Sequence, residues 1–215
     1  MSTIYIKTLL CIETSMGKKR QFDEDEVLKI VADHFWKHGY SSTKVDQLSA
    51  ITGLTKTSIY HAFGNKETLF LRAIDFYIEK DLSQHMKTID LANSLSENIE
   101  SLLSQIFLND ANEHLANGCF LTNSILELAG SDPLLHDEAT KRFAKVQQSF
   151  LPIFDHYIEN DLLKSDVSST ALTDFFMTFF QGLRVQSRNQ TQPQALKNAI
   201  SMFVGLIKTI EKENP

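Results

Sequence analysis

One stretch of the sequence limits the possible folds more than any other: residues 43 to 69, TKVDQLSAITGLTKTSIYHAFGNKETL. Thr43 and Asp46 have the spacing of a capping box at a helix N-terminus. Apolar residues then recur at helical spacing and predict one buried face: Val45, Leu48 and Ile51. Gly53 follows at the point where a helix ends in a left-handed residue, a conformation that carries no Cβ penalty for glycine. The stretch therefore predicts a short helix followed by a tight corner.

A second short helix is predicted directly after this corner. Leu54 fills the corner, Thr55 is a suitable N-cap, and two apolar side chains point toward the core, Ile59 and Phe63. The free face carries amine, hydroxyl and aromatic groups and no carboxylate: Lys56, Thr57, Ser58, Tyr60 and His61. Two short helices joined by a glycine turn, the second with a face suited to a polyanion, form a helix-turn-helix. An ordinary three-helix structural domain is the alternative interpretation.

The ungapped run from Phe22 to about Leu71 closely resembles the DNA-binding domain of TetR-type transcriptional regulators. The matching positions are Phe35, Gly39, Tyr40, Thr43, Val45, Gly53 to Lys56, Ile59 to His61, Phe63 and Asn65 to Glu67. The resemblance implies an all-α protein with an N-terminal three-helix helix-turn-helix DNA-binding domain and a C-terminal helical ligand-binding and dimerisation domain. It implies a repressor that binds a palindromic operator and is released by a small molecule.

Helix-turn-helix geometry and this resemblance together predict the DNA contacts. Side chains near the start of the second helix reach base edges or nearby phosphates, and the matching positions around them hold phosphates in the family. A basic arm before the first helix contacts the backbone or minor groove, although solvated charge explains it equally well. The predicted DNA-contact residues are Lys19, Arg20, Thr43, Thr55, Lys56, Thr57, Ser58, Tyr60, His61 and Lys66.

The net charge of −6 argues at first against a nucleic-acid partner, but the charge is unevenly distributed. Residues 16–66 contain eight Lys/Arg and six Asp/Glu, a balance of +2, whereas residues 67–215 contain twelve and twenty, a balance of −8. The first fifteen residues balance, with Lys7 against Glu13. Because only the local field steers phosphate binding, this distribution fits a DNA-binding head on an acidic body.

Three segments are predicted: an extension over 1–15, the helix-turn-helix domain over 16–64, and an effector-binding and dimerisation domain over 65–215. Residues 1–15 are expected to be poorly ordered, with a short element packed on the body as the alternative. The first helix begins at Asp23 and ends near His38. A long connecting helix runs from Asn65 to about Ile89, and further helices are predicted at about 97–109, 119–129, 133–163, 168–188 and 193–212.

Apolar stripes on the last two predicted helices indicate a dimer. Gly182 and Gly205 lie inside these helices, where each costs about 1 kcal/mol relative to alanine, a cost that a closely approaching helix would explain. Two such helices and their symmetry mates would form a four-helix bundle, as the family resemblance also implies. Filling of the chain's own core is the alternative. The predicted interface residues are Phe175, Phe179, Gly182, Leu183, Phe203 and Ile207.

An effector pocket is predicted among the middle helices, as the resemblance implies. An aromatic lining with few polar groups suits a hydrophobic or aromatic effector. The residues assigned to this pocket are Phe120, Asn123, Gln147, Phe150, Phe154 and Phe176. A protein of the same fold without a small-molecule effector, controlled by a protein partner or by thiol modification at Cys119, is the alternative.

Cys119 is predicted to begin a helix, where the dipole lowers a thiol pKa, so a thiol switch competes with a buried structural cysteine. Two cysteines, Cys11 and Cys119, provide no disulfide framework, and a reducing cytoplasm is the expected location. We expect no metal or cofactor, and no membrane span, because no apolar run approaches the roughly 18 residues required. The motifs of the common catalytic families are absent from the sequence, so we expect no enzyme activity.

Overall fold

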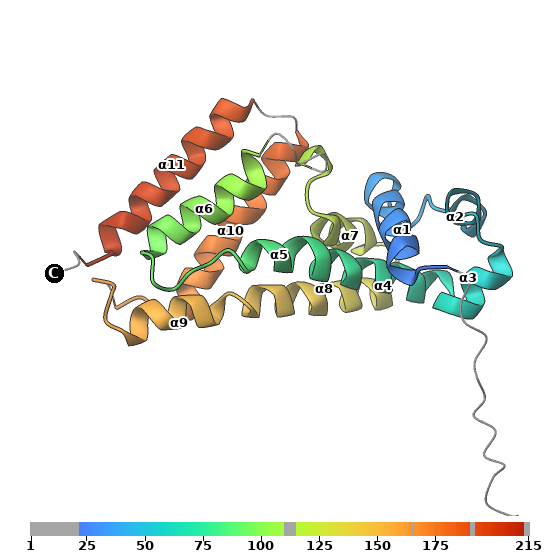
Figure 1. The fold of residues 1–215 in the computed structure, drawn as a ribbon, viewed down its shortest axis with the longest axis horizontal. Coiled ribbons are helices and arrows are strands. Elements are labelled where there is room, and N and C mark those ends of the chain that lie inside the picture. Colours follow the sequence, from blue (N-terminus) through green and yellow to red (C-terminus); the bar gives the residue numbers. More distant parts are fainter. Residues whose placement is uncertain (1–21, 110–114, 165, 190–191, 213–215) are drawn as a thin grey trace, which may run out of the picture.

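The computed structural model describes residues 22–109, 115–164, 166–189 and 192–212. The predicted extension over 1–15 and the predicted contacts Lys19 and Arg20 lie outside these ranges. The molecule is elongated, with a three-helix head at one end and the remaining helices extending away from it (Figure 1). The head consists of α1 (Glu24–His38), α2 (Val45–Thr52) and α3 (Lys56–Phe63).

The first helix has the limits that its capping residues predict. The Asp23 carboxylate accepts the backbone N–H groups of Asp25 at 2.9 Å and Glu26 at 3.4 Å. Gly39 ends the helix with a φ of +81°, and its N–H donates to the carbonyl of Phe35. The buried side chains of α1 form the stripe that packs on the fourth helix: Val27, Leu28, Val31, Ala32, Phe35 and Trp36.

The connector between head and body is less regular than predicted. Instead of one helix from 65 to about 89, α4 (Lys66–Tyr77) passes into a π-helical turn, η1 (Ile78–Leu82), and then into the short α5 (Ser83–Met86). Asn65 caps α4 by accepting the N–H of Thr68 at 2.9 Å. Because a π-helical turn closes hydrogen bonds one residue longer than those of an α-helix, the helical period of α4 does not continue unchanged into α5.

The body consists of α6 (Leu95–Phe107), the 3-10 turn η2 (Leu115–Asn117), α7 (Phe120–Leu128), α8 (Pro133–Gln148), α9 (Leu151–Glu159), α10 (Ser169–Arg188) and α11 (Pro193–Ile210). In Figure 1, α8 and α9 follow one long edge of the molecule beside α4 and α5, while α6, α10 and α11 lie together at the end farthest from the head. Within the described ranges the only β contact is an isolated antiparallel bridge between Leu163 and Glu211. The predicted all-α class is confirmed.

The prediction of a single helix over 133–163 is wrong, because the helix is interrupted between Gln148 and Leu151. Pro152 stands in the first turn of α9 and has no N–H to donate to the preceding turn. Phe150, at the break, is only 7% exposed and packs against Phe176 at a centroid distance of 5.0 Å. The break therefore directs an aromatic ring into the core.

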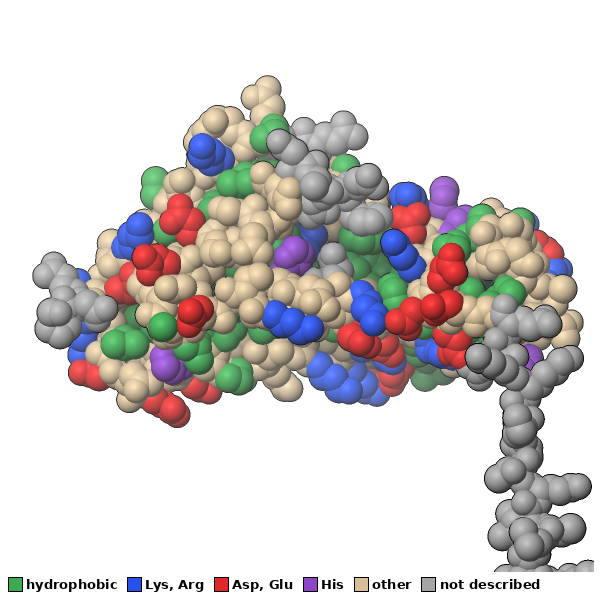
Figure 2. All heavy atoms as spheres, viewed as in Figure 1, with side chains coloured by type: hydrophobic (Ala, Val, Ile, Leu, Met, Phe, Trp, Pro, Cys, Tyr) green, Lys and Arg blue, Asp and Glu red, His purple; other side chains and the backbone are tan. Residues whose placement is uncertain are grey.

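The apolar core forms two clusters. One joins the head to α4, α7 and the first half of α8, and the other joins α6, α9, α10 and α11. Phe143 and Val146 of α8 contact both clusters. Packing is thus continuous across residue 64, and the predicted boundary there stays a prediction. Charged side chains of both signs gather over α1, α4 and α8 (Figure 2), where Arg142 bonds Asp75 at 2.7 Å and Arg72 bonds Glu24 at 2.7 Å.

Candidate DNA-binding surface and effector cavity

The turn between α2 and α3 has the predicted geometry. Gly53 ends α2 in the left-handed region at φ 69°, and Ser49 donates its hydroxyl to the carbonyl of Leu54 at 2.5 Å. Thr55 then caps α3 by accepting the N–H of Ser58 at 3.1 Å. Leu48 of α2 is fully buried, but Ile51, which was expected to share its buried face, is 42% exposed.

Two expectations for Thr43, as the N-cap of α2 and as a phosphate contact, do not fit its position in the structure. It is not the N-cap of α2: its hydroxyl donates to the carbonyl of Gly39 at 2.6 Å, and the side chain is only 1% exposed. The helix is capped at Lys44, whose backbone N–H donates to the Gln47 side chain at 2.7 Å. A buried hydroxyl that already has an acceptor does not reach a phosphate. Lys44 is an exposed cation at this end of α2 and was not among the predicted contacts.

The outward face of α3 matches the predicted composition. Lys56, Thr57, Tyr60 and His61 are exposed, Tyr60 by 47%, while Ile59 and Phe63 are buried beneath them. The Lys56 ammonium forms an ion pair with Asp46 of α2. This hydrogen bond to Asp46 raises the pKa of Lys56, so the amine is cationic at neutral pH. The pair also holds the amine beside the turn between α2 and α3.

Lys66 lies between the head and the start of α4. Its ammonium lies 4.1 Å from the centroid of the Tyr40 ring, and partial burial lowers its pKa. The Tyr40 hydroxyl donates to Glu67 at 3.1 Å, and burial followed by the charge of Glu67 raises the pKa of Tyr40. Tyr40 therefore positions Lys66. Sequence reasoning placed Tyr40 in the family pattern but assigned it no role.

Two contacts join the head to α7 and to the turn before it. Glu127 of α7 accepts the backbone N–H groups of Tyr40 at 3.0 Å and Ser41 at 2.8 Å. Trp36 of α1 donates its indole N–H to the carbonyl of Asn117 at 3.1 Å. Its ring lies 6.2 Å from that of Phe120, centroid to centroid. Trp36, to which the sequence gave no role, thus connects the recognition domain to the body.

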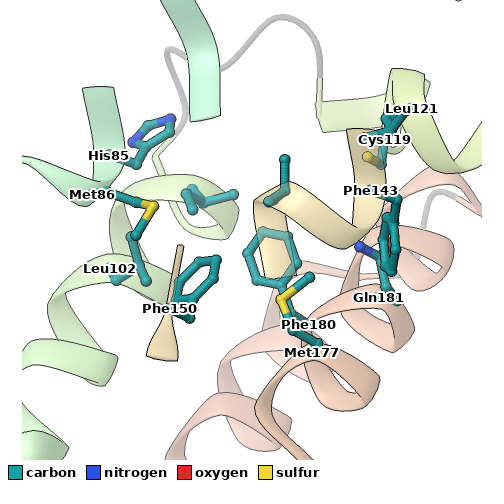
Figure 3. A pocket seen from close by; sticks show the side chains of 12 residues that line it. His85, Met86, Leu102, Cys119, Leu121, Phe143, Phe150, Met177, Phe180 and Gln181 are labelled. Atoms are coloured by element: carbon teal, nitrogen blue, oxygen red, sulfur yellow. The ribbon is translucent and has the colours of Figure 1, made fainter. Parts of the chain in front are cut away.

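A small cavity of about 20 Å³, large enough to hold about one water molecule, lies among α5, α6, α7, α8 and α10 (Figure 3). Its wall is almost entirely apolar. In Figure 3, Met86, Leu102 and Phe150 lie on one side, and Phe143, Cys119 and Gln181 lie on the other. The full lining is His85, Met86, Leu102, Ile106, Cys119, Leu121, Phe143, Val146, Phe150, Met177, Phe180 and Gln181.

Of the six residues predicted to line an effector pocket, only Phe150 lines this cavity. Phe120 packs between Trp36 and Tyr77 at the junction with the head, while Phe154 and Phe176 fill the second core cluster. The amide groups have other partners: Asn123 donates to the carbonyl of Asn117 at 2.8 Å, and Gln147 donates to Asp174 at 2.6 Å. Periodicity placed these side chains on helix faces but did not give the rotation of each helix toward its neighbours.

Two family models match the chain. The first, described as bacterial regulatory proteins of the tetR family, matches residues 32–73. The second, described as the tetracyclin repressor-like C-terminal domain, matches residues 96–203. The chain belongs to the TetR family. It is therefore a helix-turn-helix DNA-binding regulator of transcription and not an enzyme, as the sequence analysis expected.

Individual relatives agree with the TetR assignment. The chain is 25% identical over 182 residues to the HTH-type transcriptional repressor ComR of Escherichia coli K12, covering 83% of this chain and 85% of ComR. It is 24% identical to the repressor BdcR of the same organism, covering 92% and 95%. A TetR-family regulator from Cytophaga hutchinsonii has the same fold at 21% identity, with a TM-score of 0.74 and coverage of 91% and 100%. The cysteine mutant of CifR, solved with 26-base-pair operator DNA, matches at 23% identity with a TM-score of 0.69, covering 87% and 98%.

In this TetR-family chain, the predicted dimer residues divide into two groups. Leu183, Phe203 and Ile207 are at most 3% exposed within one chain, so they belong to its own core and not to an interface. Phe175 and Gly182 are exposed and Phe179 is half-buried. Three further exposed apolar side chains of α10 and α11 were not among the predicted interface residues: Val185 at 50%, Met202 at 69% and Leu206 at 50%.

Cys119 is the N-cap of α7, only 4% exposed, and its sulfur accepts the Tyr77 hydroxyl at 3.6 Å. It lines the cavity, so a reagent reaches it only through the interior of the TetR-type body. No group of three or more metal-ligating side chains occurs within the described ranges. No helix in the same ranges is long and apolar enough to cross a membrane.

Proposed function

We propose that this TetR-family protein is a homodimeric repressor that binds a two-fold-related operator and is released by a small, largely apolar effector. The observation that carries the proposal is the outward face of α3, which is free of carboxylates and is held at the end of an elongated molecule by a glycine corner. The relatives ComR and BdcR are repressors, which supports the proposed direction of control.

The proposed DNA contacts lie on α3 and at the N-termini of α2 and α4. Lys56, Thr57 and Ser58 at the start of α3 read base edges or adjacent phosphates, with Thr55 holding the turn. Tyr60, His61 and Lys66 bind phosphates around them. Lys44 at the start of α2 replaces Thr43 in this set, because its side chain is exposed and the helix dipole favours an anion there.

The proposed dimer forms through the exposed apolar face of α10 and α11. Phe175, Met202 and Leu206 are 48%, 69% and 50% exposed, at the end of the molecule away from the head. Large apolar side chains grouped on one face are typical of an interface. Two-fold pairing there would place two α3 helices where successive major grooves of one duplex can receive them.

The proposed effector response follows from the size of the cavity. At about 20 Å³ it is far smaller than the roughly 300 Å³ at which small-molecule pockets begin. An effector must therefore bind a state in which the cavity is wider, and it stabilises that state because it has no comparable site in the closed one.

The wall that must move is connected to the head. Met86 and Val146 line both the cavity and an open groove of about 670 Å³ between α8 and the η1–α5 segment, so they form the partition between solvent and interior. Displacement of Met86 moves α5, which continues through η1 into α4. Because α4 packs on α1 and bears Lys66, widening the cavity would change the separation of the two heads.

The test is selection of bound duplexes from random DNA by the purified protein, followed by gel-shift titration of the selected site. We expect a two-fold-related sequence and an affinity that falls steeply with salt. The variant Lys56→Ala/Tyr60→Ala should lose most of this affinity and reduce the salt slope by about one per phosphate contact removed. Lys197→Ala, which removes an exposed lysine of α11 far from the head, is the matched control. Unchanged binding by the double variant would disprove the assignment of α3.

A further inference from the structure

Arg184 of α10 is a buried cation without a carboxylate partner in the part of the chain that the structure describes. Arg184 is 3% exposed, and neither its Nε nor its Nη2 donates a hydrogen bond to any described residue. Nη1 reaches only the carbonyl of Gly118, at 3.5 Å. Taking a guanidinium out of water without pairing it is costly, so such a group requires a physical explanation.

The surroundings of the guanidinium compensate only part of this cost. Its central carbon lies 5.3 Å from the ring centroids of both Phe107 and Phe180. The two aromatic faces attract the cation but provide no hydrogen-bond acceptor in the plane of the group. The two unpartnered donors are Nε–H and Nη2–H, which lie along one edge of the guanidinium and form the fork that a carboxylate accepts with both oxygens.

This guanidinium adjoins the effector cavity. Phe180 flanks Arg184 and also lines the cavity. Two other wall residues, Ile106 and Cys119, directly neighbour in sequence Phe107 and Gly118, which contact the guanidinium. Arg184 itself does not line the cavity, and Phe180 lies between the guanidinium and the cavity on the α10 side. The partition toward solvent, at Met86 and Val146, is apolar.

We propose that the effector is an apolar carboxylic acid whose carboxylate binds Nε and Nη2 of Arg184 while its hydrocarbon part fills the widened cavity. This inference rests on the proposed effector response and adds the chemical class of the ligand. The acid enters from the groove at Met86 and Val146, and its charged end replaces the missing acceptor on Arg184. A neutral amide of the same shape offers a single carbonyl acceptor, leaves the cation uncompensated and binds more weakly.

The experiment compares matched acids and amides on the full-length protein. Octanoate, decanoate and 4-phenylbutyrate are titrated beside octanamide, decanamide and 4-phenylbutyramide, with binding followed by the fluorescence of Trp36, the single tryptophan of the chain. Release of the selected operator is measured in parallel. We expect at least one acid to bind at least tenfold more tightly than its amide and to release DNA.

Three variants separate ligand recognition from folding. Arg184→Met removes the buried charge and should abolish the preference for acid over amide, whereas Arg184→Lys should retain part of it. Arg188→Met, one turn farther along α10 and exposed, is the control for loss of a cation and should behave as the parent. If Arg184→Met is poorly folded, the acid-to-amide ratio of Arg184→Lys against Arg188→Met decides the question.

The outcomes also distinguish this inference from the proposed function. Equal binding and equal operator release by acids and amides would overturn the carboxylate assignment and leave a ligand-responsive repressor. Binding of neither series, with intact operator binding, would overturn the inference and leave the DNA-binding function. An unchanged acid preference in Arg184→Met would also overturn it, because the recognising group would then lie elsewhere.

Discussion

Glu127 and Tyr40 join α7 to the helix-turn-helix head: the Glu127 carboxylate, on α7, accepts the backbone N–H of Tyr40 at 3.0 Å. Its second oxygen accepts Ser41 at 2.8 Å, so one side chain holds the loop between α1 and α2. At the opposite end of α7, the N-cap residue Cys119 lines the cavity. A rigid link between cavity wall and recognition domain is what a coupled response requires.

Replacing Glu127 by alanine should destabilise the protein by about 2 kcal/mol, because two backbone donors lose a charged acceptor. Chemical denaturation measures this loss of stability directly.

Gly39→Ala should be destabilising for a related reason: at φ +81° an added Cβ would lie 2.7 Å from a Glu127 carboxylate oxygen. Because the two sites touch, the double variant should cost less than the sum of the single ones, and strict additivity would contradict the contact.

Removing the partner of Lys56 should strengthen DNA binding. Asp46→Asn frees the lysine from its ion pair and deletes a negative charge beside the phosphates, so we expect about two- to fivefold higher operator affinity at low salt. Gel-shift titration at several salt concentrations measures the change, which should shrink as salt rises. Asp155→Asn, in α9, is the control for loss of a carboxylate far from the head. Weaker binding by Asp46→Asn would show that the pair positions Lys56 and does not restrain it.

The exposed apolar face of α10 and α11 should be required for dimerisation. Met202→Glu/Leu206→Glu places charges on this face and should give a monomer at micromolar concentration by light scattering or ultracentrifugation, with a loss of operator affinity of at least tenfold. Leu134→Glu provides the matched control, since Leu134 is 82% exposed on α8. A dimer that survives the double substitution would locate the interface elsewhere.

Substitution of Gly205 by alanine should have opposite effects on the stability of the folded chain and on dimerisation. No atom of its own chain, beyond the local helix, lies within 4 Å of a Cβ added there. Gly205→Ala should therefore stabilise each folded chain by about 1 kcal/mol through helix propensity alone. If a partner helix approaches this point, the same methyl group should weaken the dimer. For Gly205→Ala in the otherwise unchanged chain, we expect a higher dissociation constant of the dimer. In the monomeric Met202→Glu/Leu206→Glu background, the same substitution should raise the free energy of unfolding.

His34 should make folding stability fall in mild acid. Burial, followed by the charge of His38, lowers the pKa of His34 below 6.5, and its Nε2 is buried without a hydrogen-bond partner in the described residues. Between the lowered native pKa and 6.5 the unfolded chain binds more protons, so stability is complete above pH 6.5 and declines as pH falls through that window. His34→Gln should flatten the decline in urea midpoints between pH 7 and 5. His38→Gln should flatten it partly, and an unaltered slope in His34→Gln would contradict this origin.

The helices of the head could be predicted because their signals are local. Asp23 and Thr55 cap the helices that follow them, and Gly53 takes the left-handed conformation, each within a few residues of the backbone groups that it satisfies. Pro152 also carried a local signal, and the break between α8 and α9 could have been predicted from it.

Contacts between distant residues were not predictable in the same way. Thr43 has the composition of an N-cap, yet the carbonyl of Gly39 takes its hydroxyl. Ile51 has the period of a core residue, yet it is 42% exposed. Phe203 and Ile207 have the helical period expected of an interface stripe, but α6 and α10 of their own chain bury them.

By itself, the sequence determined that this chain is all-α, that it carries a helix-turn-helix, and that the outward face of α3 suits DNA. Those properties follow from periodicity, caps and glycine positions, which act over one or two helical turns. Tertiary structure alone decided which apolar side chains remain exposed, where the cavity lies, and that Arg184 is buried with no carboxylate partner among the described residues. These depend on how helices far apart in the chain rotate and pack against one another, because a side chain's burial is set by its neighbours in space.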